Sequence, residues 1–463
     1  MTKIYLVRKR YLIAAALAFV AAGAGAQSVP KLKFEKYTLP NGLEVILHED
    51  HSTPIVSVNT WFKVGSGDEK PGRTGFAHLF EHIMFMGSQH VPVGDFDKLL
   101  ETAGASNNGS TTEDRTNYYE NLPSNALALA LWLDADRMGY LLPTMDKAKL
   151  DLQRDVVKNE RRQSYDNVPY GRSDEVILAA LYPRDHPYSW PVIGSMTDLS
   201  AASVDDVKDF FRTYYAPNNA TLSIAGDFNP AEAKRLVSLY FSAIPRGPAL
   251  PARPSVPRVT IAKDTFLVME DKVQLPRVFY TWPTVKVYDA DEPALDVLAS
   301  VLASDKNSRL YKRLVYDLQT AQSVRAAQQS GRLAGIFQID LLPKPGNKPA
   351  DLDKIVRDEI ERIIAQGITP RELERVKNSI RSSFLNRLAS IGGFSGKADL
   401  LNEYNYGVGT PDYVQQDAAR YQNVTVADVQ RVAKQYLSTP KIVLTVVPEG
   451  KTDLMLTGNG GDR

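Results

Sequence analysis

Two kinds of hydrophobic pattern occur along the first half of this 463-residue chain. Polar and apolar residues alternate at 43–47, and a β-branched run occupies 55–61, so we expect two strands joined by a turn at 51–54. Apolar residues then recur with helical spacing over four longer segments: 75–86, 126–141, 146–164 and 203–214. Grouped strands with helices between the groups indicate the α+β class with a largely antiparallel sheet.

The chain also contains an internal repeat. Residues 204–224 resemble residues 426–446, and residues 47–69 resemble residues 268–292, at offsets of 221 to 223. The first pair shares the pattern Val-x-Asp-Val, a tyrosine and an apolar run, which indicates a helix followed by a strand. Because two separate matches share one offset, we expect two homologous halves, each a largely antiparallel sheet flanked by helices.

A proline-rich segment separates the repeated parts. Proline occupies every third position from 245 to 257, which favours an extended, stiff linker. The alternative, a ligand for an SH3-type domain, is unnecessary because a spacer already explains the prolines. We therefore predict a first half at 28–245, a linker at 246–258, a second half at 259–450 and a flexible tail at 451–463.

The first 26 residues have the pattern of a cleavable signal peptide. Basic residues precede an apolar stretch at 11–22, and Ala24-Gly25-Ala26 forms a small-x-small cleavage site. About twelve apolar residues fall short of the roughly twenty that span a bilayer, although an uncleaved membrane anchor is the alternative. We expect a periplasmic or secreted protein with no stable membrane span after cleavage.

Composition narrows the choice of partners. The chain has 55 Lys and Arg against 54 Asp and Glu, so it lacks the overall positive charge that favours nucleic-acid binding. It contains no cysteine, and therefore has neither a disulfide nor a thiol for lipid attachment. With 43% hydrophobic residues it is long and apolar enough to bury two or more cores.

The strongest chemical signal is the segment Gly75-Phe-Ala-His-Leu-Phe-Glu-His-Ile-Met-Phe-Met-Gly87. On a helix, His78 and His82 lie one turn apart with Glu81 beside them, so all three project from one face. Two imidazoles at this spacing chelate zinc, and a neighbouring carboxylate can take a proton from water. The alternative is a pair of histidines that form ordinary hydrogen bonds in an apolar helix.

A catalytic zinc ion normally takes three protein ligands, so a third must come from elsewhere in the chain. Glu160, in a predicted helix, is the best candidate for this ligand. Without the histidines, it would be interpreted as an ordinary solvent-exposed glutamate.

A His-x-x-Glu-His motif followed by a glutamate 78 residues after the second histidine resembles the pitrilysin, insulin-degrading enzyme and mitochondrial processing peptidase family. The likeness is to the short, two-half exported bacterial type and extends along the mature chain. It implies that His78, His82 and Glu160 bind one Zn²⁺ per chain and that Glu81 is the general base. It also implies that an edge strand around Asn108, Gly109 and Ser110 binds an extended peptide substrate as an added strand.

The sequence departs from that family in three places. Gln153 stands where many relatives have a supporting glutamate, and the second half has Ser300, Ala303 and Ser304 where the first has its motif. Val315 and Gln322 stand where self-sufficient relatives have an Arg and a Tyr that grip the substrate. These groups could come from a related partner subunit or, if the alignment has slipped, from four nearby residues: Arg309, Tyr311, Arg313 and Tyr316.

We therefore expect a zinc-dependent metalloendopeptidase that hydrolyses extended peptides or unfolded polypeptides. The alternatives are a non-catalytic assembly subunit and a peptide-binding or chaperone-like module of the same fold. The intact zinc motif favours the enzyme, because a scaffold has no chemical need for it.

Overall fold

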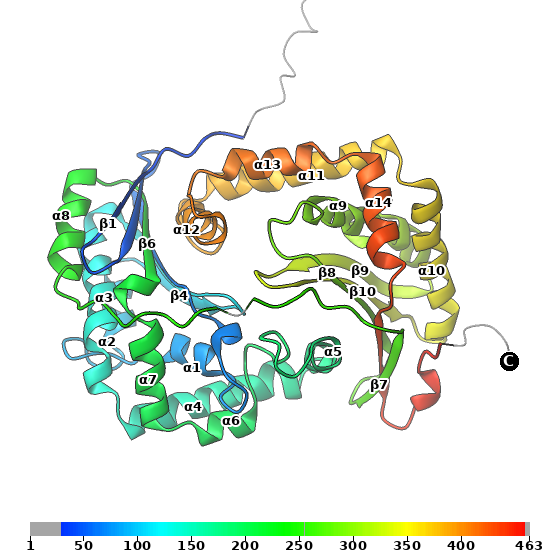
Figure 1. The fold of residues 1–463 in the computed structure, drawn as a ribbon, viewed down its shortest axis with the longest axis horizontal. Coiled ribbons are helices and arrows are strands. Elements are labelled where there is room, and N and C mark those ends of the chain that lie inside the picture. Colours follow the sequence, from blue (N-terminus) through cyan, green and yellow to red (C-terminus); the bar gives the residue numbers. More distant parts are fainter. Residues whose placement is uncertain (1–28, 254, 459–463) are drawn as a thin grey trace, which may run out of the picture.

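The computed structural model describes residues 29–253 and 255–458, so the predicted signal peptide at 1–26 lies outside the described residues. The chain forms two sheets, each flanked by helices, which lie side by side (Figure 1). The expected α+β fold with two halves is confirmed. In the described part of the chain, no helix is both long and apolar enough to cross a membrane.

The first sheet has six strands in the order β1-β2-β6-β3-β5-β4. Only β2 and β6 run parallel, and the other neighbours are antiparallel. β4 therefore forms an open edge. The strands are β1 (Glu35–Thr38), β2 (Glu44–Glu49), β3 (Ile55–Phe62), β4 (Ser106–Thr111), β5 (Thr116–Pro123) and β6 (Ala220–Gly226).

The second sheet repeats this topology without the first strand. Its order is β7-β11-β8-β10-β9, with β7 and β11 parallel and β9 at the edge. Each position corresponds to one in the first sheet, so β9 is the counterpart of β4. The strands are β7 (Thr265–Asp271), β8 (Arg277–Thr284), β9 (Ala321–Ser330), β10 (Gly335–Pro343) and β11 (Ile442–Pro448).

Eight α-helices are described in the first half and six in the second. The first eight are α1 (Phe76–Ile83), α2 (Asp95–Thr102), α3 (Leu127–Tyr140), α4 (Lys147–Arg161), α5 (Ser173–Leu181), α6 (Met196–Ala201), α7 (Val204–Tyr214) and α8 (Pro230–Phe241). The others are α9 (Glu292–Ala303), α10 (Pro349–Gln366), α11 (Pro370–Ala389), α12 (Lys397–Val408), α13 (Val414–Gln422) and α14 (Val426–Leu437). The four helices predicted from periodicity correspond to α1, α3, α4 and α7, and their ends agree within three residues.

Each half has its own hydrophobic core between its sheet and its helices. Val58, Phe80 and Leu222 are fully buried in the first core. Trp282 and Phe337 are buried in the second. Two separate cores agree with a duplicated unit.

The two halves also exchange a helix. α12 of the second half packs against β3 and β6 of the first sheet, and α5 of the first half packs against β11 of the second (Figure 1). Trp61 Nε1 on β3 donates a hydrogen bond to Asp399 on α12 at 2.8 Å, and Asn402 Nδ2 donates to the Asn59 carbonyl at 2.9 Å. Each half therefore helps to cover the other's sheet.

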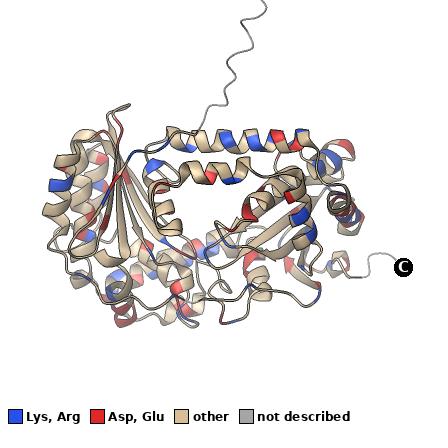
Figure 2. Cartoon of the chain, turned by 45° about the horizontal axis from the view of Figure 1, so that its top comes forward, with Lys and Arg blue, Asp and Glu red and all other residues tan. Residues whose placement is uncertain are grey.

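The segment between α8 and β7 has no helix or strand among its described residues. Arg253 anchors it to the first half through an ion pair with Asp68 at 3.4 Å. At the other end of the chain, Leu456 is buried and its N–H donates to Thr445 Oγ1 at 3.1 Å, so residues near 456 pack onto the second half. Acidic and basic residues are distributed over both halves (Figure 2).

Candidate metal centre

α1 carries the first three predicted site residues, and its amino end is held by a buried carboxylate. Gly75 caps the helix with a positive φ of 86° and makes no side-chain cap hydrogen bond. Glu69 instead accepts hydrogen bonds from the N–H groups of Gly75 and Ala77, at 2.9 and 2.7 Å. The apolar face of α1 packs into the first core, which directs His78, Glu81 and His82 away from it.

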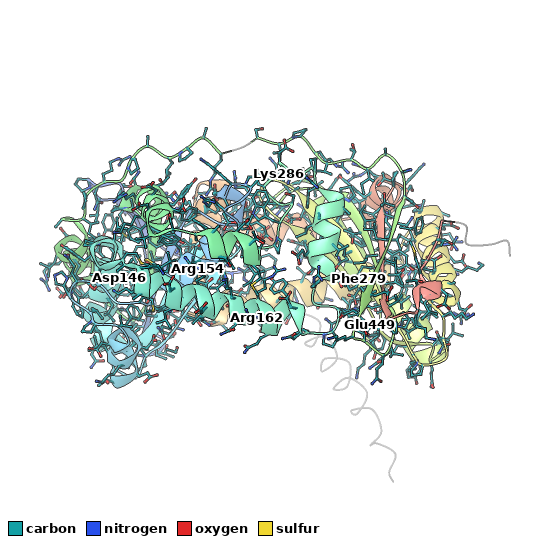
Figure 3. The ribbon with its side chains drawn as sticks, turned by 90° about the horizontal axis from the view of Figure 1, so that it is seen from below. Asp146, Arg154, Arg162, Phe279, Lys286 and Glu449 are labelled. Carbon is teal, nitrogen blue, oxygen red and sulfur yellow. The ribbon has the colours of Figure 1, made fainter. Side chains whose placement is uncertain are left out.

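α4 carries Glu160 to the same place. The helix begins at the cap residue Asp146, whose side chain accepts a hydrogen bond from Lys149 N at 2.9 Å. α4 packs against α1, and Figure 3 shows its course through the labelled residues Asp146, Arg154 and Arg162. Glu160 lies in the last turn, so the fold joins it to the histidines across 78 residues of sequence.

Three donor atoms converge between these helices. Nε2 of His78 lies 3.4 Å from Nε2 of His82, and Glu160 Oε2 lies 3.2 Å from His82 Nε2 and 3.7 Å from His78 Nε2. Donors about 2.0–2.1 Å from a tetrahedral zinc ion lie about 3.3–3.4 Å from one another. In the described part of the chain, no other group of three metal-ligating side chains converges in this way. The donor set and its spacing thus fit zinc.

The charge states also fit a metal site. Burial lowers the pKa of His78 to about 4, so its imidazole is neutral at pH 7 and has a free lone pair. Its other nitrogen, Nδ1, is buried without a hydrogen-bond partner among the described residues. The hydrogen bond with His82 lowers the pKa of Glu160, which keeps this carboxylate ionised.

Glu81 lies beside the three donors and has a different partner. Its Oε2 accepts a hydrogen bond from Thr111 Oγ1 on β4 at 2.6 Å, and burial raises its pKa. A Cβ atom at Gly109 would lie 3.0 Å from Glu81 Cγ and 3.3 Å from Oε1. Glycine at this position therefore lets the edge strand approach the glutamate closely.

The register of β4 decides which of its backbone groups face the open edge. Hydrogen-bonded pairs alternate along antiparallel strands. Thr112 N donates to Arg115 O at 2.9 Å, and the β4–β5 register then pairs Ser110 with Asn117 and Asn108 with Tyr119. The N–H and C=O groups directed outward consequently belong to Asn107, Gly109 and Thr111. In agreement, Gly109 N donates to the side chain of Asn108 at 2.8 Å, and not to β5.

The four alternative substrate-gripping residues of the second half have different environments. Arg309 forms ion pairs with Glu359 and Glu372 at 3.0 and 2.7 Å, and Tyr311 packs against the second core. Arg313 and Tyr316 are exposed. Of the two positions at which the sequence departs from self-sufficient relatives, Val315 packs against the second core and Gln322 is exposed on β9.

The second half has a cavity at the counterpart of the metal centre. It measures about 590 Å³ and lies among α9, α11 and β9, the counterparts of α1, α4 and β4. Ser300 and Ser304 line it, together with several acidic residues that include Asp296 and Glu403. No metal-ligating trio is found there among the described residues.

Comparison with known proteins decides the family. The model described as "Insulinase (Peptidase family M16)" matches residues 44–189, and the model described as "Peptidase M16 inactive domain" matches residues 201–380. "Zinc protease PqqE" of Helicobacter pylori is 30% identical over 433 residues, which cover 92% of this chain and 96% of the relative. The chain belongs to peptidase family M16.

Two further matches agree with this assignment. A crystal structure of a protease from Helicobacter pylori matches with a TM-score of 0.80 and 27% identity, covering 90% of this chain and all of the other. A probable mitochondrial-processing peptidase subunit beta of Arabidopsis thaliana is 23% identical over 423 residues, which cover 89% of this M16 chain and 77% of the relative. The predicted resemblance to this family is thereby confirmed.

Sequence reasoning did not single out three residues that the structure places at the site. Glu69 holds the amino end of α1, and Thr111 donates a hydrogen bond to Glu81. The backbone N–H and C=O of Asn107 face the open edge. The segment 106–112 is polar throughout and shows no alternation, so the only signal for the last two was its resemblance to the edge strand of the family. Nothing local distinguishes Glu69, because its partners become neighbours only on folding.

Proposed function

We propose that this M16 chain is a zinc metalloendopeptidase that hydrolyses extended peptides or unfolded polypeptides. The observation that carries the proposal is the convergence of His78 Nε2, His82 Nε2 and Glu160 Oε2 beside Glu81 and an open strand edge. Relatives named zinc proteases support it.

In this proposal, His78, His82 and Glu160 hold the ion through two imidazole nitrogens and one carboxylate oxygen. When bound there, zinc supplies Lewis acidity toward water and the substrate carbonyl. Glu81 takes the proton of the attacking water at its carboxylate and later returns it to the leaving nitrogen. Thr111 holds the Glu81 carboxylate, so that its free oxygen is directed consistently.

The substrate lies along β4 as an added antiparallel strand. The edge offers the backbone donors and acceptors of Asn107, Gly109 and Thr111. Main-chain pairing of this kind requires an extended peptide and imposes little sequence preference. Gly109 brings this peptide close to Glu81. Of the residues expected from the family resemblance, Gly109 contributes its main chain. The Asn108 side chain accepts the Gly109 N–H in the free protein, and a substrate carbonyl takes its place. The Ser110 main chain pairs with β5.

The decisive experiment compares Glu81→Gln with Glu160→Gln in the purified mature chain. Glu81→Gln is expected to keep about one zinc per chain and lose cleavage of an unfolded protein, because it removes a base and not a ligand. Glu160→Gln is expected to lose metal. Metal analysis beside a peptidase assay provides both readouts. Loss of zinc in Glu81→Gln with retention in Glu160→Gln would reverse the two roles.

The same assay tests the non-catalytic alternative, which the name of the second matching model, an inactive domain, brings into consideration. A scaffold or chaperone-like subunit binds peptide without cleaving it, whether alone or with a partner chain.

Export through a cleaved signal peptide is a further part of the proposal. Amino-terminal sequencing of the mature protein is expected to show a chain that begins near Gln27.

A further inference from the structure

One segment contacts both helices that carry the proposed zinc ligands. We call residues 190–198 the bridging segment. On the side of α1, Ser195 N donates to Thr74 Oγ1 at 3.1 Å, and the N–H and Oγ1 of Thr74 donate to Asp198 Oδ2 at 3.1 and 2.6 Å. Thr74 directly precedes the cap residue Gly75. The bridging segment therefore holds the chain at the point where α1 begins.

The same segment orients the carboxylate that caps α1. Trp190 Nε1 donates to Glu69 Oε2 at 3.1 Å and to the Ser66 carbonyl at 3.0 Å. Glu69 in turn accepts from the first N–H groups of the helix. The amino end of α1 is thus fixed from two sides, one turn before His78.

On the side of α4, the bridging segment is held by the residue next to a proposed ligand. Arg161 Nη1 donates to the Gly194 carbonyl at 2.6 Å, and its other amino group pairs with Glu175 of α5 at 2.9 Å. Arg161 is 7% exposed, so its hydrogen bond to the Gly194 carbonyl is shielded from water. Glu160 precedes it in the last turn of the helix.

The contact between the bridging segment and α1 leaves no free space. Gly194 and Gly75 both have positive φ, 71° and 86°. A Cβ atom at Gly194 would lie 2.4 Å from both Cα and N of Gly75. When two backbones are in direct contact, a displacement of one moves the other. Flexible side chains between them would instead absorb part of the displacement.

We infer that the bridging segment sets the separation of α1 and α4 and that Arg161 is a positioning residue for the metal centre. The inference rests on the proposed zinc function. The chain of contacts runs from α1 through Thr74 and Gly75 to Gly194, and from Gly194 to Arg161 on α4. Outer-shell groups that orient ligands typically change metal affinity about 10–100-fold when they are replaced.

Arg161→Met tests this inference, with Arg154→Met as the matched control. Arg154 lies two turns earlier on α4, is labelled in Figure 3, and donates to the Ala202 carbonyl just beyond α6. Both changes remove an arginine of α4 that bonds a backbone carbonyl in the region around α6. The Zn²⁺ dissociation constant is measured by competition with a chromophoric chelator, beside the thermal midpoint of the metal-free chain.

Arg161→Met is expected to weaken zinc binding about 10–100-fold, and Arg154→Met less than about threefold. The visible spectrum of the Co²⁺-loaded protein is expected to change only in Arg161→Met, since it reports ligand geometry and not fold stability. Trp190→Phe, which keeps an aromatic side chain and removes the N–H donor, is expected to weaken Zn²⁺ binding as well. It provides the test if Arg161→Met fails to fold.

The possible outcomes separate the two proposals. If the unaltered chain binds no zinc, the proposed function is overturned and this inference with it. If the unaltered chain binds zinc and Arg161→Met and Trp190→Phe bind it equally well, only the positioning role is overturned. Equal weakening in Arg161→Met and Arg154→Met, with unchanged Co²⁺ spectra, would assign both arginines to general stability.

Discussion

Gly109 illustrates how one missing side chain shapes the site. Its backbone is directed to the open edge, and the space that a side chain would occupy is taken by Glu81. A Cβ contact at 3.0 Å requires its neighbour to move by a few tenths of an ångström. Small displacements of a catalytic group are costly, because a shift of about 1 Å can reduce the rate about 10²-fold.

We predict that Gly109→Val reduces peptidase activity about 10²-fold and leaves zinc content unchanged, because its methyl groups displace Glu81 but not the ligands. Gly109→Ala is expected to retain activity within about tenfold. The control is Ser106→Val, since the Ser106 side chain lies on the opposite face of β4. Kinetics and metal analysis of the three variants provide the test. Zinc loss in Gly109→Val would contradict the assigned geometry.

Asp296 in the second half gives a prediction for pH. Burial raises its pKa to about 7, and Tyr421 OH donates to its carboxylate at 2.7 Å. The folded chain therefore holds this proton to a higher pH than the unfolded chain, so stability is lost as pH rises from about 4 through 7.

Asp296→Asn removes this titration while its amide oxygen still accepts the Tyr421 hydrogen bond. We expect the variant to raise the free energy of unfolding by about 1–3 kcal/mol at pH 8, with a gain that shrinks as pH falls toward 4. Urea unfolding at several pH values measures this. A gain independent of pH would show that the Asp296 carboxyl does not titrate in this way.

At the scale of elements, the exchanged helix α12 has a defined anchor. Asp399 in its first turn accepts hydrogen bonds from Trp61 Nε1 at 2.8 Å, Asn117 Nδ2 at 3.0 Å and Ser395 N at 2.8 Å. Asp399 is 6% exposed, and its side-chain donors Trp61 and Asn117 are buried as well. Trp61 and Asn117 belong to β3 and β5, and the contact joins the two halves.

We predict that Asp399→Ala lowers the free energy of unfolding by about 2–4 kcal/mol, because it leaves buried donors without an acceptor. Asp412→Ala is the matched control, since Asp412 follows α12 and forms a more exposed ion pair with Lys31. Its effect is expected to stay below about 1 kcal/mol. Chemical denaturation distinguishes the two variants, and equal effects would show that α12 is not anchored here.

At the scale of the whole molecule, one fold occurs twice, and the proposed metal-ligating set occurs once among the described residues. The strand order β2-β6-β3-β5-β4 recurs as β7-β11-β8-β10-β9. The histidines of α1 have as their counterparts Ser300 in α9 and Ser304 directly after it, and a cavity lies at the equivalent place. Among the described residues, the second half therefore shares the architecture of the first and not its chemistry.

The prediction of a partner subunit rests on two residues of the second half. Val315 and Gln322 cannot supply the positive charge and phenol of self-sufficient relatives, and loss of one transition-state donor typically costs about 10²–10³ in rate. We expect the isolated chain to bind zinc and cleave peptides weakly until a related chain carrying the Arg and Tyr is added. Peptidase rates with and without that chain provide the measurement.

Four nearby residues provide the control for this prediction, because an error in the alignment would make one of them the missing donor. They are Arg309, Tyr311, Arg313 and Tyr316. The structure gives Arg309 two ion pairs of its own, so its replacement is expected to affect stability more than catalysis. The need for a partner would be contradicted if the homogeneous chain is fully active and remains so when each of the four residues is replaced.

The sequence by itself determined the class of fold, the duplication and the positions of α1, α3, α4 and α7. These follow from short-range regularities: the 3.6-residue and 2-residue periods of apolar side chains and a repeat at one offset. The spacing of His78, Glu81 and His82 is also local, because one helical turn fixes it. Tertiary structure alone decided that Glu160 lies 3.2 Å from His82 Nε2, that Thr111 bonds Glu81, and that α5 and α12 cross between the halves. Each of these features depends on how distant segments pack. Side-chain volumes and buried hydrogen bonds determine that packing, and no local sequence pattern encodes it.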